Sequence, residues 1–365
     1  MTTTGSDGEG PGARGRLRTV HGPLDLPCFL PDATRAVVRT LDSADLEACG
    51  IRVLMVNILH LSSHPGVSTV NSAGGVHPFM GWPHPVMSDS GGFQVFSLIS
   101  KDAALGSVSA DGFSYKLSRE HEKKLLSPEK CIRNQLRIGS DILFCLDHCT
   151  HPDQDRQTQR ESVRNTVRWA RRCREEFGRT VAMKAMATDA RPLLFAVVQG
   201  GEDRDLRREC AEGLLEIGFD GYGFGGWPVD SKGNLTEAVG LLRELIPAEF
   251  PLHALGVGKP GNIRKAVAMG YSMFDCVLPT RDARQGRIVV RTEKGHGYLH
   301  IRDEKYMKDG KPLEDGCDCL CCSRYGRAYL HHLFVIGDAL AMRLATIHNL
   351  RAYSRLMEEL QAGKG

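Results

Sequence analysis

Seven short apolar runs recur along the chain, and each ends at or near a small or polar residue. These residues are Asn57, Asp89, Asp147, Gln199, Gly226, Gly258 and Asp275. Between several of the runs lie segments with helical apolar spacing, at residues 160–177, 203–217, 235–245 and 262–269. Strands that alternate with helices predict parallel βαβ units.

This alternation predicts an α/β fold, a (β/α)8 TIM barrel, which a chain of 365 residues is long enough to form. A doubly wound open sheet is the structural alternative. No Gly-x-Gly-x-x-Gly follows the first strand, which disfavours a dinucleotide-binding sheet. In a barrel the strand-end residues would share one rim, where reactive side chains collect.

Composition excludes a membrane-spanning protein, because no apolar run approaches the roughly 20 residues that cross a bilayer. Residues 1–15 are rich in Gly, Thr and Ser and predict a disordered tail rather than a secretory signal. We therefore expect a cytoplasmic protein. The net charge of +3 is too small to indicate a nucleic-acid partner by itself.

The pattern changes near Arg287, where short strand-like and turn-rich segments replace the alternation. We expect a barrel core over residues 16–287, an inserted zinc-binding subdomain over 288–350, and a closing carboxyl-terminal helix over 338–361.

Four of the twelve cysteines crowd into six residues. Cys317, Cys319 and Cys322 form Cys-x-Cys-x-x-Cys, with Cys321 as an extra thiol. Three thiolates and one imidazole make a closed tetrahedral site, which predicts one structural Zn²⁺ per chain. The alternative is a loop of unpaired thiols. The candidate imidazoles are His331, His332 and His348.

Asp89 lies in MSDSGGFQVFSL, directly before a tight turn made by Ser90, Gly91 and Gly92. So few side-chain atoms would let a planar ligand approach the backbone, and Phe93 could stack on it. The alternative is an aspartate that only caps the following turn.

Asp147 ends so apolar a run that its carboxylate would be costly to bury without a partner or ligand, which favours a functional role.

Asp275 precedes Arg281 and Arg284, which form a basic segment. Such a segment is suited to a phosphate-bearing substrate, and the alternative is an exposed loop with salt bridges. Two carboxylates on one rim support glycosidic chemistry through a covalent intermediate. Hydrolysis and base exchange share this first step.

From about residue 26 to 353, the sequence resembles the tRNA-guanine transglycosylase family. The motifs are LPCFLPDATRAVVRTLDSADLEACG, NILHL and GGVHPFMGWPHPVMSDSGGFQVFSL in the first half. FDCVLPTRDARQG, the cysteine cluster and HNLRAY follow in the second half.

The resemblance implies an irregular (β/α)8 barrel with a zinc subdomain. It implies that Asp275 is the nucleophile at ribose C1′ and that Asp89 is the general acid/base. The positions matching base-binding residues are Ser90, Gly91, Gly92, Phe93, Asp147, Gln199, Gly226 and Trp227. Those matching RNA-binding segments include Gly256, Lys259, Thr280, Arg281 and Arg284. The zinc ligands would be Cys317, Cys319, Cys322 and His348.

The implied reaction exchanges guanine at the wobble position of tRNA, in a UGU anticodon loop, for a 7-deazaguanine base such as queuine or a preQ1-like base. It belongs to queuosine modification of tRNA, and the family forms homodimers. The alternatives are a relative that modifies DNA and a non-catalytic RNA-binding subunit. The presence of both Asp89 and Asp275 disfavours the latter.

Two departures from the family pattern concern base recognition. His148 stands where many bacterial members have glutamate. The Gly-Gly-Leu-Ala-Val-Gly-Glu loop is replaced by Gly-Gly-Trp227-Pro228-Val-Asp-Ser231, which brings in a bulky indole and removes one backbone N–H. We hypothesise that the incoming base is not ordinary preQ1, and that queuine or another 7-substituted deazaguanine is accepted.

Overall fold

The computed structural model describes residues 15–187, 190–293 and 295–363. Residues 1–14 of the predicted tail lie outside this described part. The chain first forms a hairpin of β1 (Gly15–Thr19) and β2 (Gly22–Leu26), paired antiparallel.

Eight parallel strands form the central sheet, in the spatial order β3-β13-β12-β11-β10-β9-β5-β4. They are β3 (Cys28–Pro31), β4 (Leu54–Asn57), β5 (Val86–Asp89), β9 (Ile142–Phe144), β10 (Leu193–Val198), β11 (Gly221–Phe224), β12 (Leu252–Ala254) and β13 (Met273–Cys276). A parallel bridge between Asp32 and Met55 joins the first and last strands. Chain order thus equals spatial order around a nearly closed ring. The (β/α)8 barrel is confirmed, and the open doubly wound sheet is excluded.

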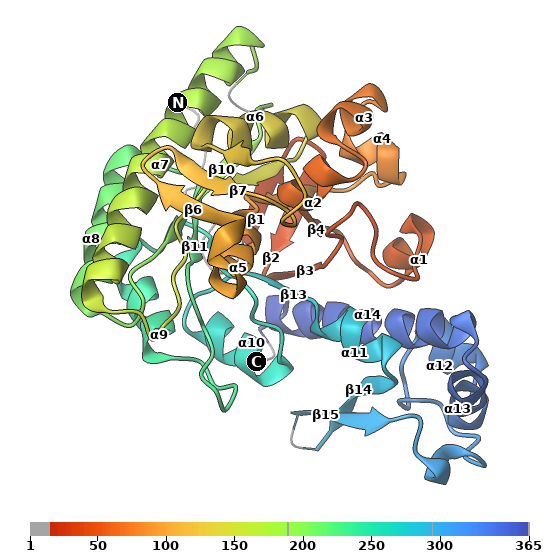
Figure 1. The fold of residues 1–365 in the computed structure, drawn as a ribbon. Helices are drawn as coiled ribbons and strands as arrows, with labels where there is room; N and C mark the ends of the chain where they lie inside the picture. Colours follow the sequence, from red (N-terminus) through yellow and green to blue (C-terminus); the bar gives the residue numbers. More distant parts are fainter. Residues whose placement is uncertain (1–14, 188–189, 294, 364–365) are drawn as a thin grey trace, which may run out of the picture.

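Helices connect the strands and cover the outside of the barrel (Figure 1). They are α1 (Ser43–Ala48), α2 (Ile58–Ser63), α3 (Val67–Ser72), α4 (Val76–Met80), α5 (Gly92–Lys101), α6 (Pro128–Ile138), α7 (Arg156–Met183), α8 (Arg204–Ile217), α9 (Glu237–Leu245), α10 (Pro260–Ala268) and α11 (Leu278–Arg284). The four helical segments expected from spacing fall on α7 to α10. Helix α7 extends beyond its apolar pattern at both ends, and at its amino-terminal end the Asp155 side chain caps it by accepting from the Thr158 N–H.

Side chains fill the barrel interior, as in other barrels of eight strands. Met87, Phe144, Phe195 and Met273 are buried in one cluster with residues of the β1–β2 hairpin. The hairpin therefore contributes to the barrel core. Another small sheet, of β6 (Gly106–Ser109), β7 (Gly112–Tyr115) and β8 (Lys124–Leu126), is inserted between β5 and β9.

The chain after the barrel forms a second unit. It contains β14 (Arg287–Thr292), β15 (Gly295–His300), the 3-10 turn η2 (Glu304–Tyr306), α12 (Leu320–Arg324), α13 (Arg327–Ile336) and α14 (Ala339–Gln361). Figure 1 shows α14 running between this unit and the barrel. The buried Asn349 side chain donates to the carbonyls of Pro279 and Arg287 and accepts from the Val289 N–H. Helix α14 thereby fixes the second unit to the barrel.

No helix in the described part of the chain combines the length and apolarity needed to span a membrane.

Gln135 on α6 fastens that helix to the barrel wall. Its buried amide donates to the Phe144 carbonyl at 2.9 Å and accepts from the Phe144 N–H at 3.1 Å and the Ser88 hydroxyl at 2.6 Å. Gln135→Leu leaves these groups unpaired, so we predict a loss of about 2–4 kcal/mol in the free energy of unfolding, measured in urea. Gln157→Leu, on the exposed face of α7, serves as the control. Equal stability of the two variants would contradict the prediction.

Candidate active site and metal centre

A cavity of about 360 Å³ opens at the carboxyl ends of the barrel strands. It is lined by eight of the residues predicted from the sequence, namely Asp89, Phe93, Asp147, Gln199, Gly226, Trp227, Gly256 and Asp275. Further lining residues are Gln94, Cys149, Val197, Phe224, Gly225, Pro228, Val229 and Leu255. Residues up to 186 positions apart in the sequence (89 to 275) therefore face one space of the size of a small-molecule site.

Asp275 lies in β13, and its carboxylate is partly exposed. Its Oδ1 accepts a hydrogen bond from the Gly256 N–H at 3.1 Å and lies 2.9 Å from Nε2 of the buried His253. Strand β12 and the turn that follows it thus hold one carboxylate oxygen in place.

Asp89 is the last residue of β5, and its Oδ2 accepts from the side-chain amides of Asn57 at 2.9 Å and Gln94 at 3.3 Å. Burial raises the pKa of Asp89, and the nearby charge of Asp275 raises it further. A carboxyl group with a raised pKa holds a proton more readily at neutral pH, which suits an acid/base role.

Asp147 lies three residues beyond the end of β9 and is buried. Burial raises its pKa to about 7, although the Gln199 amide donates to its Oδ2 at 2.6 Å. Gly225 lies so close that a Cβ there would come within 2.6 Å of the Gln199 side chain. Gly226 follows with φ of 91°, a conformation that favours glycine. Two glycines therefore allow the loop after β11 to approach Gln199.

Phe93 and Trp227 stand at the cavity as large aromatic side chains that remain 41% and 40% exposed. Their ring centroids lie 6.0 Å apart in an edge-to-face arrangement. The Trp227 indole N–H donates to the Thr150 carbonyl at 3.3 Å, and its ring meets His151 at 5.5 Å. The indole is thus held in place rather than left free in solvent.

His148 does not line the cavity. Its ring packs 5.8 Å from Trp169, and Nδ1 lies 3.3 Å from the Asn165 amide nitrogen. Burial lowers the pKa of His148 to about 4, so the imidazole is neutral at physiological pH. The departure from the family pattern at this position therefore adds no positive charge to the cavity.

The rest of the predicted base-binding turn lies behind the cavity. The buried Ser90 hydroxyl accepts from the Gly92 N–H at 3.2 Å, and Gly91 caps α5. These residues shape the start of α5, and none of the three lines the cavity.

The predicted RNA-binding residues are divided between surface and interior. Lys259 and Arg281 are exposed, whereas Thr280 is buried and its hydroxyl donates to the Val277 carbonyl. Burial lowers the pKa of Arg284, and the positive charge of Arg39 lowers it further. Arg39 and Arg284, which are far apart in the sequence, therefore lie close enough to interact electrostatically. The sequence alone did not reveal this proximity.

Sequence reasoning also missed Asn57, Gln94 and His253 as neighbours of the two aspartates. Asn57 ended one of the apolar runs, and His253 is a single imidazole within another, so both left a signal. Gln94 left none, because only the fold of α5 brings its amide to Asp89.

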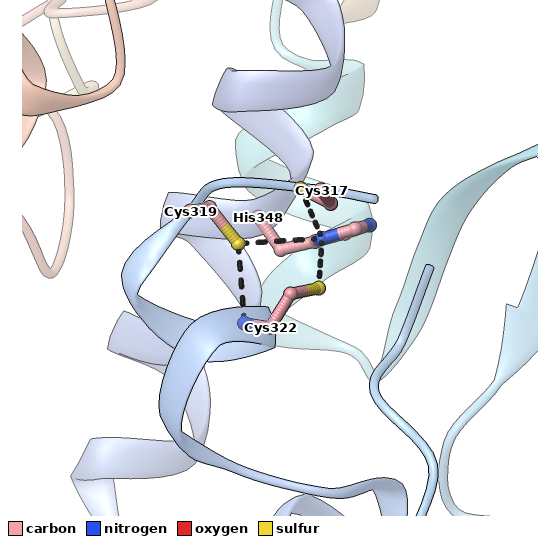
Figure 2. Close-up of side chains that lie close together, drawn as sticks. All are labelled: Cys317, Cys319, Cys322 and His348. Carbon is pink, nitrogen blue, oxygen red and sulfur yellow. Dashed lines mark hydrogen bonds between the residues drawn. The ribbon is translucent and has the colours of Figure 1, made fainter. Parts of the chain in front are cut away.

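Cys317, Cys319, Cys322 and His348 gather between α12 and α14 (Figure 2). The three sulfur atoms lie 3.7, 3.6 and 3.2 Å from Nδ1 of His348. Ligands of one tetrahedral zinc ion would be about 3.6 Å apart, given its usual bond lengths to sulfur and nitrogen. The cluster can therefore bind a metal ion.

The outer nitrogen of His348 supports this arrangement. Nε2 lies 2.8 Å from the Val289 carbonyl, so it carries the proton and leaves the Nδ1 lone pair directed at the sulfurs. Cys321 is buried but is not a member of the cluster, and His331 contacts the Ile301 carbonyl instead. The choice of His348 over His331 and His332 fits the geometry.

Comparison with known proteins gives one consistent result. The sequence matches the Queuine tRNA-ribosyltransferase family over residues 7–363. A protein of that name from Psychrobacter sp. (strain PRwf-1) is 40% identical over 97% of this chain and 90% of its own length. Relatives of the same name from Solidesulfovibrio magneticus and Syntrophobacter fumaroxidans are 39% and 40% identical over 98% and 95% of this chain, and 92% and 89% of their own lengths. The chain therefore belongs to the queuine tRNA-ribosyltransferase family, the tRNA-guanine transglycosylases.

Proposed function

We propose that the protein is a pentosyltransferase that exchanges guanine at the wobble position of tRNA for a 7-deazaguanine base, in queuosine modification. The observation that carries this proposal is the presence of Asp89 and Asp275 on one cavity of nucleobase size. Membership of the family and the names of the relatives support it. The twelve cysteines are thiols rather than disulfides, which fits a reducing compartment, and the cytoplasm is the location that we propose.

Asp275 acts as the nucleophile. A carboxylate oxygen attacks ribose C1′, the C1′–N9 bond to guanine breaks, and the electron pair leaves with the base. The result is an ester between Asp275 and the ribose, while the phosphate backbone stays intact.

Asp89 moves the proton in both halves of the reaction. In the first half its carboxylic acid protonates N9 of the departing guanine, so that the base leaves neutral and Asp89 becomes a carboxylate. In the second half it removes the N9 proton from the incoming base, whose N9 then attacks C1′ and returns the ester electron pair to Asp275. Before the attack, burial and the charge of Asp275 raise the pKa of Asp89, which suits its role as the acid. Once Asp275 is an ester this charge is gone, which favours the carboxylate form of Asp89 that acts as the base. Two successive inversions at C1′ retain the β-glycosidic configuration.

The purine edge is read by Asp147, Gln199 and the backbone at Gly226, which lie together on one wall. Phe93 stacks on the base from the cavity mouth, and Ser90 supports this loop from behind. A wrong base flipped into the cavity would leave these buried polar groups without hydrogen bonds. This cost makes the site selective for the correct base.

Queuine or another 7-substituted deazaguanine is the incoming base, in preference to preQ1. Trp227 and Val229 supply apolar surface at the cavity. The only carboxylate nearby in this loop, Asp230, is exposed and accepts from the backbone N–H groups of Lys232 and Asn234. Because preQ1 and queuine both carry an amine on the arm at position 7, the preference rests on the apolar surface of Trp227 and Val229, which a larger 7-substituent can contact and the small arm of preQ1 cannot fill.

The RNA backbone lies along Gly256, Lys259 and the α11 arginines. Arg284 is close enough to Arg39 and Arg281 for their positive charges to act on it, and the carboxylate of Asp32 offsets only part of this effect. A phosphate group would compensate the remaining positive charge. The Thr280 hydroxyl donates to the Val277 carbonyl and so does not bind the RNA. Thr280 therefore contributes to RNA binding only through the backbone of α11.

One structural Zn²⁺ is held by Cys317, Cys319, Cys322 and His348, within a zinc-binding subdomain that spans residues 288–350. The ion supplies no chemistry to the exchange, because three thiolates and one imidazole leave no open position. It fixes the loop before α12 to α14.

A second copy of the chain covers the exposed face of this subdomain. Tyr325 and Tyr329 stack at 5.0 Å, and Val335 and Ile336 are 66% and 59% exposed at the end of α13. Such an apolar face is typical of an oligomer contact. A monomer in sedimentation at micromolar concentration would exclude the homodimer.

The exchange itself is tested with radiolabelled guanine, unmodified tRNA with a UGU anticodon loop, and a DNA control. We predict that label enters only the tRNA, that Asp275→Asn abolishes entry, and that queuine displaces the label faster than preQ1. Comparable incorporation of queuine and preQ1 would refute the base preference alone. Label in DNA only would favour a DNA-modifying enzyme, and no label at all would favour a non-catalytic subunit.

Zinc content is tested by substituting single thiols. Cys319→Ser is expected to lower bound zinc from about one ion per chain to near zero and to lower the thermal unfolding midpoint by several degrees, since a structural site contributes folding energy. Cys321→Ser is the matched control and retains its zinc. Loss of zinc from Cys321→Ser, with retention in Cys319→Ser, would overturn the ligand set.

The pH dependence of stability reports on Asp147. Because its folded pKa of about 7 lies above the unfolded value, the folded protein holds a proton that the unfolded chain has released between pH 4 and 7. Stability therefore falls as pH rises through this window. Relative to Asp147→Asn, the wild type should lose about 2–3 kcal/mol in unfolding free energy between pH 5 and 7.5. A parallel pH profile for the two proteins would contradict this, and Asp111→Asn, at an exposed site, is the control.

A further inference from the structure

His253 is a buried histidine in the middle of β12, and its side chain contacts Asp275 inside the barrel. Nε2 lies 2.9 Å from Oδ1 of Asp275, on the neighbouring parallel strand β13. The imidazole also packs against Phe144, with ring centroids 5.6 Å apart. A polar ring in this apolar interior needs a partner, and Asp275 is the one that it has.

The other ring nitrogen identifies the tautomer. Nδ1 of His253 is buried and has no hydrogen-bond partner within the described residues. A proton on Nδ1 would place an unpaired N–H in the interior, whereas an unprotonated Nδ1 leaves only a weaker acceptor unpaired. The imidazole is therefore neutral, with its proton on Nε2, and it donates to Asp275.

The two oxygens of Asp275 differ in their surroundings. Oδ1 receives both the His253 donor and the Gly256 N–H, at 2.9 and 3.1 Å. No hydrogen bond to Oδ2 is found from any residue that the structure describes. The lone pairs of Oδ2 are thus free, and the carboxylate is held from rotating by its other oxygen.

We propose that His253 is a positioning residue that, together with the Gly256 N–H, holds Oδ1 of Asp275 and makes Oδ2 the attacking oxygen. This inference rests on the proposed role of Asp275 as nucleophile. Oδ2 bonds to C1′ as the C1′–N9 bond breaks, and Oδ1 becomes the carbonyl oxygen of the ester. When the incoming base attacks, the Oδ2–C1′ electron pair returns to the carboxylate, and both donors stabilise its charge.

Loss of the hydrogen bond from His253 shifts the equilibrium between the free enzyme and the covalent ester. A hydrogen bond to an ionised carboxylate is stronger than one to a neutral ester carbonyl. Removing the donor therefore destabilises the free enzyme more than the ester. The equilibrium shifts toward covalent adduct, while discharge of the ester by the incoming base slows.

The test measures the fraction of enzyme bound covalently to a UGU anticodon stem-loop RNA, at fixed guanine concentration, after a denaturing quench. His253→Phe keeps a ring of similar size without the donor, and it should raise the ratio of adduct to free enzyme about tenfold. Its turnover should fall, with the KM for guanine little changed. His253→Gln keeps a donor nitrogen at similar reach and should stay within about threefold of wild type, consistent with the small spread among equivalent donors.

A ratio in His253→Phe that is unchanged or lower would overturn the proposal, as would equal ratios in the Phe and Gln variants. Absence of adduct in the wild type would instead refute the nucleophile assignment. Nitrogen-15 NMR of histidine-labelled wild type, with the His253 signals assigned by their loss in His253→Gln, tests the tautomer even where His253→Phe does not fold. Protonated Nε2 with bare Nδ1 is expected, and the opposite tautomer would overturn the proposal.

Discussion

Amide, backbone and imidazole groups hold the three carboxylates of the cavity. Asp89 is bound by the amides of Asn57 and Gln94, Asp147 by Gln199, and Asp275 by a backbone N–H and an imidazole. Amide donors orient a carboxylate without neutralising its charge, so burial still raises the pKa of Asp89 and of Asp147. An arginine in their place would lower these values and remove the acid. The raised pKa values of Asp89 and Asp147 therefore depend on burial within the barrel and on hydrogen-bond donors that leave the carboxylates charged.

Helix α14 connects this cavity to the cluster of Cys317, Cys319, Cys322 and His348. Successive residues of one helix turn serve both: His348 belongs to the Cys3His cluster, and Asn349 donates to the carbonyls of Pro279 in α11 and of Arg287 at the start of β14. One turn further, the Tyr353 hydroxyl donates to the Gly258 carbonyl beyond β12. The segments that follow β12 and β13 are thus fixed from outside by a helix that also supplies His348 to the cluster.

Much of the architecture was predictable, because apolar runs ending at Asp89, Gln199 and Asp275 report directly on strands of a barrel. The cluster was predictable from cysteine spacing, although the choice of His348 came from family resemblance. Contacts across strands were not predictable, since no periodicity indicates that His253 faces Asp275 or that Gln94 reaches Asp89. Nor does the sequence reveal which polar side chains are used internally: His148 is turned toward α7, and the Thr280 hydroxyl is bound to its own helix. Such orientations are fixed by packing rather than by local pattern.

The division of roles between the two aspartates is the central claim, and peptide mapping of the covalent adduct tests it most directly. Enzyme mixed with the anticodon stem-loop RNA is denatured, digested with nuclease and protease, and examined by mass spectrometry. We predict a ribose phosphate remnant, without its guanine, on the peptide that contains Asp275, with Asp89 unmodified. Such a remnant on Asp89, or on any other residue, would contradict the account.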